Sequence, residues 1–260
     1  MSMIRLVLEY DGSEFHGWQA QPDTRTVEGV LRDAIRDVTG ETPHLSAAGR
    51  TDAGAHSHGQ VVGVPLSSDW DPQRLGAALN ALLPEDVAVR RAGAAASNFH
   101  ARFDALSRTY RYVVASRHER MPLLRRHAWH CSGPLDADAM REAASLMRGT
   151  HDFAAFGRSP RRDGTTVRTV HQASVRRVAA PLADEAPAYV IEVSADAFLY
   201  GMMRAIAGAL VAVGRGRTSV GDVAGMLAEP GDCATVTVAP ARGLHQWSVT
   251  YPAPTAETES

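Results

Sequence analysis

The chain has 260 residues, of which 45% are hydrophobic and 22% are charged, so it can bury a large core as one domain or as two closely packed halves. Its two cysteines, Cys131 and Cys233, are too few and too far apart for a disulfide framework or a cysteine-based zinc site. Neither a secretory leader nor a long apolar run is evident, so we expect a soluble cytoplasmic protein without a membrane segment.

The first predicted elements are strands and helices in alternation. Apolar residues alternate over residues 4–8, which predicts a strand that ends at the turn residues Asp11-Gly12. Apolar residues recur at helical spacing over 27–38, with Thr26 as the expected N-cap and Gly40 as the expected C-terminal stop. A second helix is expected to begin at Asp71-Pro72, because proline fits the first helical turn. Further strands are predicted over residues 60–64, 87–91 and 108–114.

The segment 48–57, which reads AGRTDAGAHS, has no hydrophobic period, so core packing does not account for its residues. Asp and Gly are common turn residues, and a simple tight turn is one interpretation. The segment nevertheless leads into the predicted strand at 60–64, and loops held by strands often carry reactive groups. Arg50 stands two residues before Asp52, where an extended backbone would place both side chains on one face. A neighbouring guanidinium would favour the ionised, nucleophilic form of the carboxylate.

The second half of the chain repeats the order of helices and strands, although no sequence identity between the halves is visible. Helices are predicted over residues 136–147 and 198–213 and from residue 219, and strands over 167–177, 189–193 and 246–251. The pattern as a whole indicates an α/β protein with antiparallel character.

The formal net charge of −2 conceals a strong asymmetry. Residues 90–177 hold 17 arginines against 7 acidic residues, a balance of +10, whereas the remainder holds 10 arginines against 22 acidic residues, a balance of −12. The chain has no lysine. A single arginine usually belongs to a solvated face, but guanidinium groups pair bidentately with phosphates, so the collective asymmetry indicates a polyanionic partner.

Residues 49–54, GRTDAG, resemble the signature motif of the tRNA pseudouridine synthase A family. Other motifs of that family occur in order along nearly the whole chain: Tyr10-Asp11-Gly12, Gly17-Trp18-Gln19, Phe99-His100-Ala101-Arg102, Arg108-Thr109-Tyr110-Arg111-Tyr112, His151-Asp152-Phe153, Met203-Arg204, Ala239-Pro240 and Gly243-Leu244. The resemblance implies an α/β (α+β) fold with two similar halves around a shared, mainly antiparallel sheet flanked by helices, and a central RNA-binding cleft. We expect an N-terminal half at 1–104 with the aspartate motif, a C-terminal half at 105–252 and a flexible tail at 253–260.

The same resemblance implies that uridine is isomerised to pseudouridine in the anticodon arm of tRNA, at positions 38, 39 and 40. Asp52 aligns with the catalytic aspartate, which would attack the ribose or abstract a sugar proton. Tyr110 aligns with the tyrosine that stacks on the target base, and Arg204 with the arginine expected to pair with the carboxylate. Arg50 is the candidate to fill the space left by the extruded base. The family implies no cofactor, no metal and a homodimer.

Three other interpretations start from the same residues. Asp52-Ala53-Gly54 resembles the turn of aspartic proteases, but the chain has no second copy to complete a carboxylate pair. A zinc site could in principle draw on the histidines and cysteine at His56, His58, His127, His130 and Cys131, although no further paired ligands lie nearby. A non-catalytic RNA-binding module would explain the arginine-rich middle, but it leaves Asp52 unexplained.

Overall fold

The computed structural model describes residues 2–160, 163–180, 186–229, 231 and 236–253. Cys233 and the tail expected at 253–260, apart from its first residue, lie outside these ranges. The strands are β1 (Ser2–Tyr10), β2 (Ser46–Ala47), β3 (His56–Leu66), β4 (Val87–Ala95), β5 (Ser107–Ser116), β6 (Trp129–Cys131), β7 (Gly149–Asp152), β8 (Val167–Ala179), β9 (Pro187–Ala195) and β10 (Leu244–Thr250). The α-helices are α1 (Val27–Thr39), α2 (Pro72–Leu82), α3 (Ala137–Leu146), α4 (Met202–Gly214) and α5 (Val220–Ala228). Short 3-10 helices include η1 (Gly12–Glu14), η2 (Pro122–Leu124) and η5 (Ala241–Gly243).

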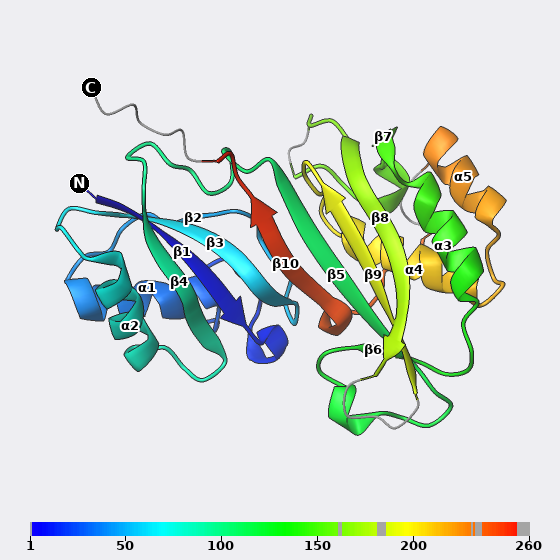
Figure 1. Ribbon diagram of the computed structural model, residues 1–260, viewed down its shortest axis with the longest axis horizontal. Coiled ribbons are helices and arrows are strands. Elements are labelled where there is room, and N and C mark those ends of the chain that lie inside the picture. The colour runs from blue at the N-terminus through cyan, green and yellow to red at the C-terminus, as the bar shows by residue number, and fades with distance from the viewer. Residues whose placement is uncertain (1, 161–162, 181–185, 230, 232–235, 254–260) are drawn as a thin grey trace.

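The described strands form one ten-stranded sheet, which spans the molecule in Figure 1. The main path runs β4-β1-β3-β10-β5-β9-β8-β7, with β2 paired to β3 and β6 paired to β5. All neighbours are antiparallel except the pairs β10–β3 and β5–β6. The last strand, β10, therefore joins the strands of the first half to those of the second. The predicted α/β fold with a mainly antiparallel sheet is confirmed.

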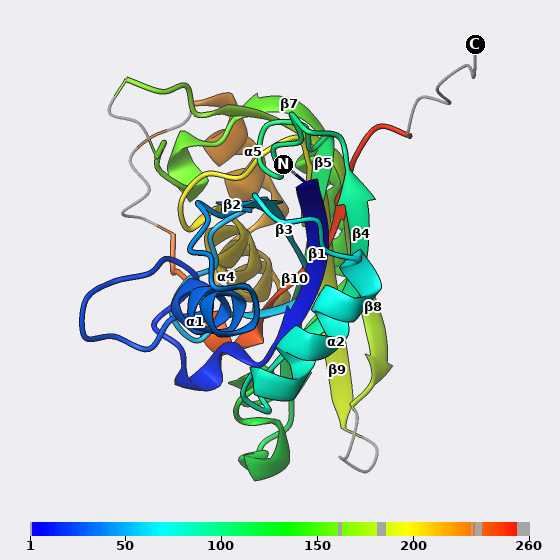
Figure 2. The ribbon, with the colours of Figure 1, turned by 90° about the vertical axis from the view of Figure 1, so that its left-hand side faces the viewer.

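The helices pack on one face of this sheet, and Figure 2 shows α1 and α4 on the same side of the strands. One apolar core lies between α1, α2 and the strands β1, β3 and β4, and a second lies between α3, α4 and the strands β5, β8 and β9. The opposite face carries polar side chains, among them Arg111, whose guanidinium stacks on Trp247 at 3.6 Å and pairs with Glu192 at 2.5 Å. In the described part of the chain, no helix combines the length and the apolar character needed to cross a membrane.

The caps expected from the sequence hold the helices where predicted. The Thr26 hydroxyl accepts a hydrogen bond from the Gly29 amide at 3.2 Å, and Gly40 closes α1 in the left-handed conformation with φ 75°. Asp71 caps α2 through the Arg74 amide at 2.8 Å. The helix predicted from residue 198 begins only at Met202, because Gly201 has φ 78° and interrupts the helical backbone. The short strands β6 and β7 carry too few residues to give a periodic signal and were missed.

Buried polar side chains line the centre of the sheet on the face that the helices cover, where β3, β10 and β5 meet. Gln246 of β10 is fully buried, and its amide nitrogen donates to the Gln60 side-chain oxygen at 3.2 Å. The register places Gln246 beside Ser57 of β3 and opposite Tyr110 of β5. The junction of the two halves is thus polar inside, whereas the core on either side of it is apolar.

Candidate active site

The segment around Asp52 forms a turn directly before β3. The Ala55 amide donates to the Asp52 carbonyl at 3.1 Å, and Gly54 has φ 78°, as the third residue of a type II turn requires. The segment therefore forms the predicted turn, and this turn carries Asp52, the residue that was predicted to be reactive. The Gly54 amide also donates to the Phe15 carbonyl at 3.2 Å, so the turn is fixed to the segment that follows β1.

Two glycines of that segment allow the close approach. A Cβ on Gly12 would lie 1.8 Å from the Ala55 carbonyl oxygen, and one on Gly17 would lie 2.7 Å from the Thr51 carbonyl oxygen. The Trp18 amide donates to the same Thr51 oxygen at 3.1 Å. The sequence marks Gly12 as a turn residue and Gly17 only as part of a family motif, and only the structure reveals that both pack against the Asp52 turn.

Asp52 pairs with Arg204 from the first turn of α4. Arg204 Nη1 lies 2.7 Å from Asp52 Oδ2, and the two side chains are only 25% and 17% exposed. Arg204 Nε donates to the Ala239 carbonyl at 2.7 Å, and the Ala239 amide donates back to the Arg204 carbonyl at 3.1 Å. The guanidinium therefore has two partners, and its hydrogen bond to the Ala239 carbonyl orients it toward the Asp52 carboxylate. The structure brings together residues 152 positions apart, as the family resemblance implied.

Tyr110 lies beside this ion pair on the helix-covered face of β5. Its hydroxyl oxygen would be 3.1 Å from a Cβ on Gly49, so it touches the backbone of the Asp52 segment. Phe198 packs edge-on against the Tyr110 ring with centroids 4.7 Å apart. Burial raises the pKa of Tyr110 to about 12, and the charge of Asp52 acts in the same direction. The phenol is consequently protonated at neutral pH.

The spacing of Arg50 and Asp52 suggested a neighbouring guanidinium, but these two described residues do not pair. The Arg50 side chain is exposed and makes no hydrogen bond or ion pair to any described residue. The guanidinium next to Asp52 is that of Arg204.

His56, four residues after Asp52, fixes the end of the turn. Its Nδ1 accepts a hydrogen bond from the Gly12 amide at 3.1 Å, and its Nε2 donates to the Arg126 carbonyl at 2.8 Å, with the Arg242 carbonyl at 3.2 Å. Burial lowers the pKa of His56, which is only 2% exposed, so the neutral imidazole is the stable form. One side chain thus joins β3 to three other segments.

The histidines and cysteine considered for zinc do not form one cluster. Within the described residues, His56, His127 and Asp11 do offer ligand atoms within 4.8 Å of one another, but both nitrogens of His56 already have backbone partners. His130 Nε2 bonds to the Arg117 carbonyl at 2.8 Å, and Cys131 is buried in the second core. The arrangement favours a hydrogen-bonding role for these histidines over metal binding.

Fold and site together define a class of enzyme. An anchored carboxylate lies beside a buried tyrosine, where the strands of the two halves meet. This is the arrangement that the sequence motifs implied for pseudouridine synthases. The family model described as tRNA pseudouridine synthase matches residues 6–104 and 143–252, which include Asp52, Arg50 and Arg204, whereas Tyr110 lies between the two ranges. The chain belongs to the tRNA pseudouridine synthase family, and it is accordingly an isomerase that converts uridine to pseudouridine in tRNA.

Curated relatives agree over nearly the full length. A protein named tRNA pseudouridine synthase A from Thermoanaerobacter sp. (strain X514) is 37% identical over 96% of this chain and 100% of its own length. A protein of the same name from Chloroflexus aurantiacus (strain ATCC 29366 / DSM 635 / J-10-fl) is 42% identical over 97% of this chain and 90% of its own length. A third, from Methylobacterium radiotolerans, is 40% identical over 96% and 98% respectively.

Proposed function

We propose that Asp52 carries the isomerisation and that the substrate uridines lie in the anticodon arm of tRNA, at positions 38, 39 and 40. The observation that carries the proposal is the contact of 2.7 Å between Arg204 and Asp52, set beside Tyr110. This contact joins the motif of the first half to a helix of the second. A non-catalytic RNA-binding module has no need of such an arrangement.

The reaction breaks the bond between N1 of uracil and C1′ of ribose and forms a bond between C5 and C1′. The Asp52 carboxylate either attacks C1′ or removes a proton from the sugar, and Arg204 orients it for both routes. The C5 proton is lost to solvent and N1 gains one, so the net reaction is an isomerisation that needs no redox partner. The site must therefore hold a detached uracil between the two bond changes.

Tyr110 and Arg50 contribute to binding the flipped nucleotide. Tyr110, kept protonated by burial, offers an aromatic surface and a hydrogen-bond donor to the base, whereas a phenolate acting as base is disfavoured by its raised pKa. Arg50 is exposed and unpaired among the described residues, so it is available to enter the RNA stack when the uridine leaves it. The cost of flipping, a few kcal/mol, is offset by such contacts.

The proposal includes a cytoplasmic homodimer with tRNA bound in a cleft between the halves. The polar junction at β3, β10 and β5, next to Asp52, supports this location for the cleft. Sedimentation of the free protein tests the dimer: a single species at the mass of one chain at micromolar concentration would contradict it.

The activity test uses unmodified tRNA with tritium at C5 of uracil, because every turnover releases that hydrogen. The intact protein is expected to release tritium, and Asp52→Asn to release it at least about 10³-fold more slowly while it still binds tRNA. Asp69→Asn, which changes an exposed carboxylate without a side-chain partner among the described residues, is the matched control. Full activity of Asp52→Asn would eliminate the assigned role, and binding without release by the intact protein would favour the RNA-binding module. Mapping of pseudouridine in the product tests positions 38 to 40.

A further inference from the structure

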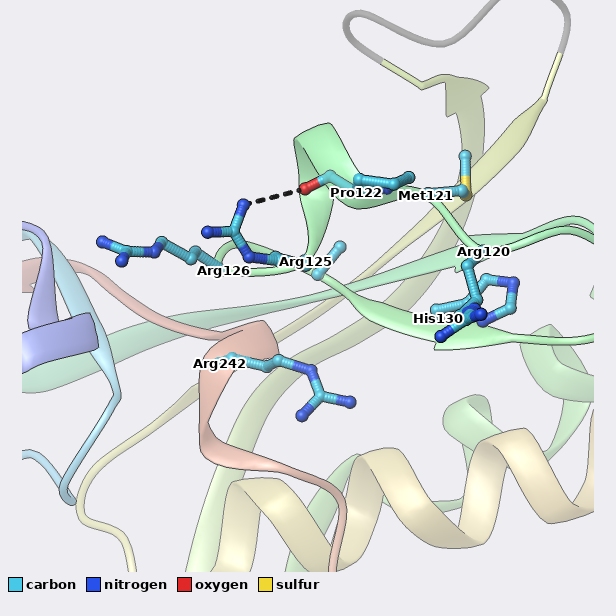
Figure 3. A pocket seen from close by; sticks show the side chains of 8 residues that line it. Arg120, Met121, Pro122, Arg125, Arg126, His130 and Arg242 are labelled. Carbon is cyan, nitrogen blue, oxygen red and sulfur yellow. Dashed lines mark hydrogen bonds between the residues drawn. The ribbon is translucent and has the colours of Figure 1, made fainter.

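A pocket of about 640 Å³ is lined by Arg126 and Arg242, whose carbonyls contact His56, and Figure 3 shows several arginine side chains around it. Its walls come from the segment that contains η2, from the start of β6 and from η5. The lining residues are Arg120, Met121, Pro122, Arg125, Arg126, Ala128, His130 and Arg242. Four of these eight are arginines, and none is acidic.

The charges of the pocket are only partly neutralised. Arg126 pairs with Glu14 at 2.9 Å, and Arg125 donates to the Pro122 carbonyl at 3.3 Å. The guanidinium groups of Arg120 and Arg242 have no hydrogen-bond or ion-pair partner among the described residues. Unneutralised guanidinium groups around a hollow favour an anion, and their planar donors match the oxygens of a phosphate.

The backbone segment 239–242 runs from the active site to the pocket. The Ala239 carbonyl accepts from Arg204, the Pro240 carbonyl accepts from the Tyr112 hydroxyl at 2.6 Å, and Arg242 lines the pocket. Three residues of backbone span at most about 11 Å. Arg242 therefore lies near the residue that anchors Arg204.

His56 reinforces this connection. Its Nε2 contacts the carbonyls of Arg126 and Arg242, one from each wall of the pocket, while its own strand begins four residues after Asp52. The pocket and the catalytic turn are thus fixed to the same side chain.

We propose that Arg120 and Arg242 bind a backbone phosphate of the tRNA strand close to the target uridine, and so position that strand over Asp52. The inference rests on the proposed function for its substrate. Arg242 lies outside the arginine-rich block at 90–177, so the charge distribution along the sequence did not point to it.

The test compares equilibrium binding of fluorescent tRNA to the intact protein and to the double variant Arg120→Gln/Arg242→Gln across a KCl series. Each lost phosphate contact reduces the slope of log affinity against log salt by about 0.7 to 0.9. We expect the double variant to lose roughly one unit of slope and about ten-fold in affinity at low salt. Arg74→Gln, which removes an exposed arginine from α2, is the matched control and is expected to change neither quantity.

A second arm locates the phosphate. Single neutral methylphosphonate linkages are placed on either side of the target uridine in an anticodon stem-loop. One such linkage close to the target uridine is expected to weaken binding to the intact protein but not to the double variant. The assignment is wrong if the double variant matches Arg74→Gln in slope and affinity. It is also wrong if no methylphosphonate linkage weakens binding to the intact protein more than binding to the double variant.

A third arm separates RNA from a small ligand. Inorganic phosphate that binds the intact protein but not the double variant, with tRNA affinity unchanged, would overturn the RNA assignment. Because all three arms measure binding, they are independent of turnover. Absence of tritium release by the intact protein would refute the proposed function, whereas an unaltered salt slope in the double variant would refute only this inference.

Discussion

At the scale of single residues, the site depends on the two bonds made by Arg204. Its Nη1 lies 2.7 Å from Asp52 and its Nε lies 2.7 Å from the Ala239 carbonyl. A guanidinium can bind both partners at once because it carries several N–H donors. A lysine has one point charge and cannot reproduce this geometry. Arg204→Lys is therefore expected to slow tritium release by about 10- to 100-fold, and Arg204→Gln by about 10²- to 10³-fold.

Single-turnover measurements at saturating tRNA check this prediction, because they separate the chemical step from binding. Arg217→Lys, an exposed arginine just beyond the same helix, is the control and should leave the rate unchanged. Equal rates for Arg204→Lys and the intact protein would mean that the second bond has no part in orienting Asp52.

How far the site was predictable differs from residue to residue. Turn chemistry and the neighbouring strand pointed to Asp52, and the turn at Gly54 is confirmed. The partner of Asp52 was not accessible in this way, because Arg204 lies 152 residues further on and looks by local pattern like a helix charge that reaches solvent. The family resemblance supplied it. The spacing of Arg50 and Asp52 favoured Arg50 as the neighbouring guanidinium, whereas Arg204 holds that place in the structure.

At the scale of elements, the parallel pair β3 and β10 brings two buried histidines into contact. The rings of His56 and His245 stack with centroids 4.7 Å apart, and the two residues are 2% and 8% exposed. Burial lowers the pKa of His245 to about 3, and the nearby His56, His58 and His127 contribute in the same direction. Both imidazoles are therefore neutral in the folded protein at neutral pH.

The lowered pKa values predict a loss of stability in mild acid. Below about pH 6.5 the unfolded chain binds protons on these histidines while the folded chain does not, so the free energy of unfolding falls as pH decreases. For His245 the fall continues from about pH 6.5 toward its folded pKa of about 3, with a limiting slope of about 1.4 kcal/mol per pH unit. Urea unfolding at pH 7, 6 and 5 measures it, and His245→Gln should reduce the pH dependence.

His118 provides the control, because its side chain is exposed and His118→Gln should leave the pH dependence unaltered. If His245→Gln and the intact protein lose stability equally between pH 7 and 5, the buried histidine does not cause the acid sensitivity.

Helix α4 makes a close backbone contact that its sequence does not predict. A Cβ on Gly208 would lie 1.7 Å from the Thr237 carbonyl oxygen, so Gly208→Ala must displace either the helix or the segment that leads to Ala239. We expect a loss of about 1 to 3 kcal/mol in the free energy of unfolding. Slower tritium release should accompany it, because Ala239 anchors Arg204.

The control for this prediction is Gly225→Ala in α5, where no atom lies within 4 Å of the added Cβ. An exposed helical glycine replaced by alanine should gain about 0.5 to 1 kcal/mol. Chemical denaturation of the two variants under identical conditions compares them, and equal stabilities would contradict the proposed backbone clash.

Elements with strong local signals were predictable, and those created by tertiary contact were not. Residues 27–38 combine an apolar period with two caps, so α1 follows from its own sequence. Strands β6 and β7 have three and four residues and exist because β5 and β8 pair with them. The role of Gly201 was also not predictable, because its backbone conformation ends one segment and starts α4.

At the scale of the whole molecule, the positions of the charges matter more for RNA binding than the net charge does. The net charge of −2 would oppose association with RNA if it acted from the centre of the molecule, but interactions beyond about 10 Å are largely screened at 0.1 M salt. The arginines of residues 90–177 and Arg242 are therefore expected to act on phosphates in their own neighbourhood. The long sheet lets both contribute, because η5 and β10 return the end of the chain to its centre, as Figure 1 shows.

This local action predicts that tRNA affinity depends steeply on salt although the protein carries a net negative charge. If three to six phosphates are neutralised, the slope of log affinity against log salt should lie between about −2 and −5. Affinity would then fall by about 10- to 10³-fold from 50 to 200 mM KCl. Binding of tRNA to Asp52→Asn, which leaves the substrate intact, gives the slope without interference from turnover. A slope near zero would remove the arginines from the interface and leave the base contacts at Tyr110 and Arg50 as the source of affinity.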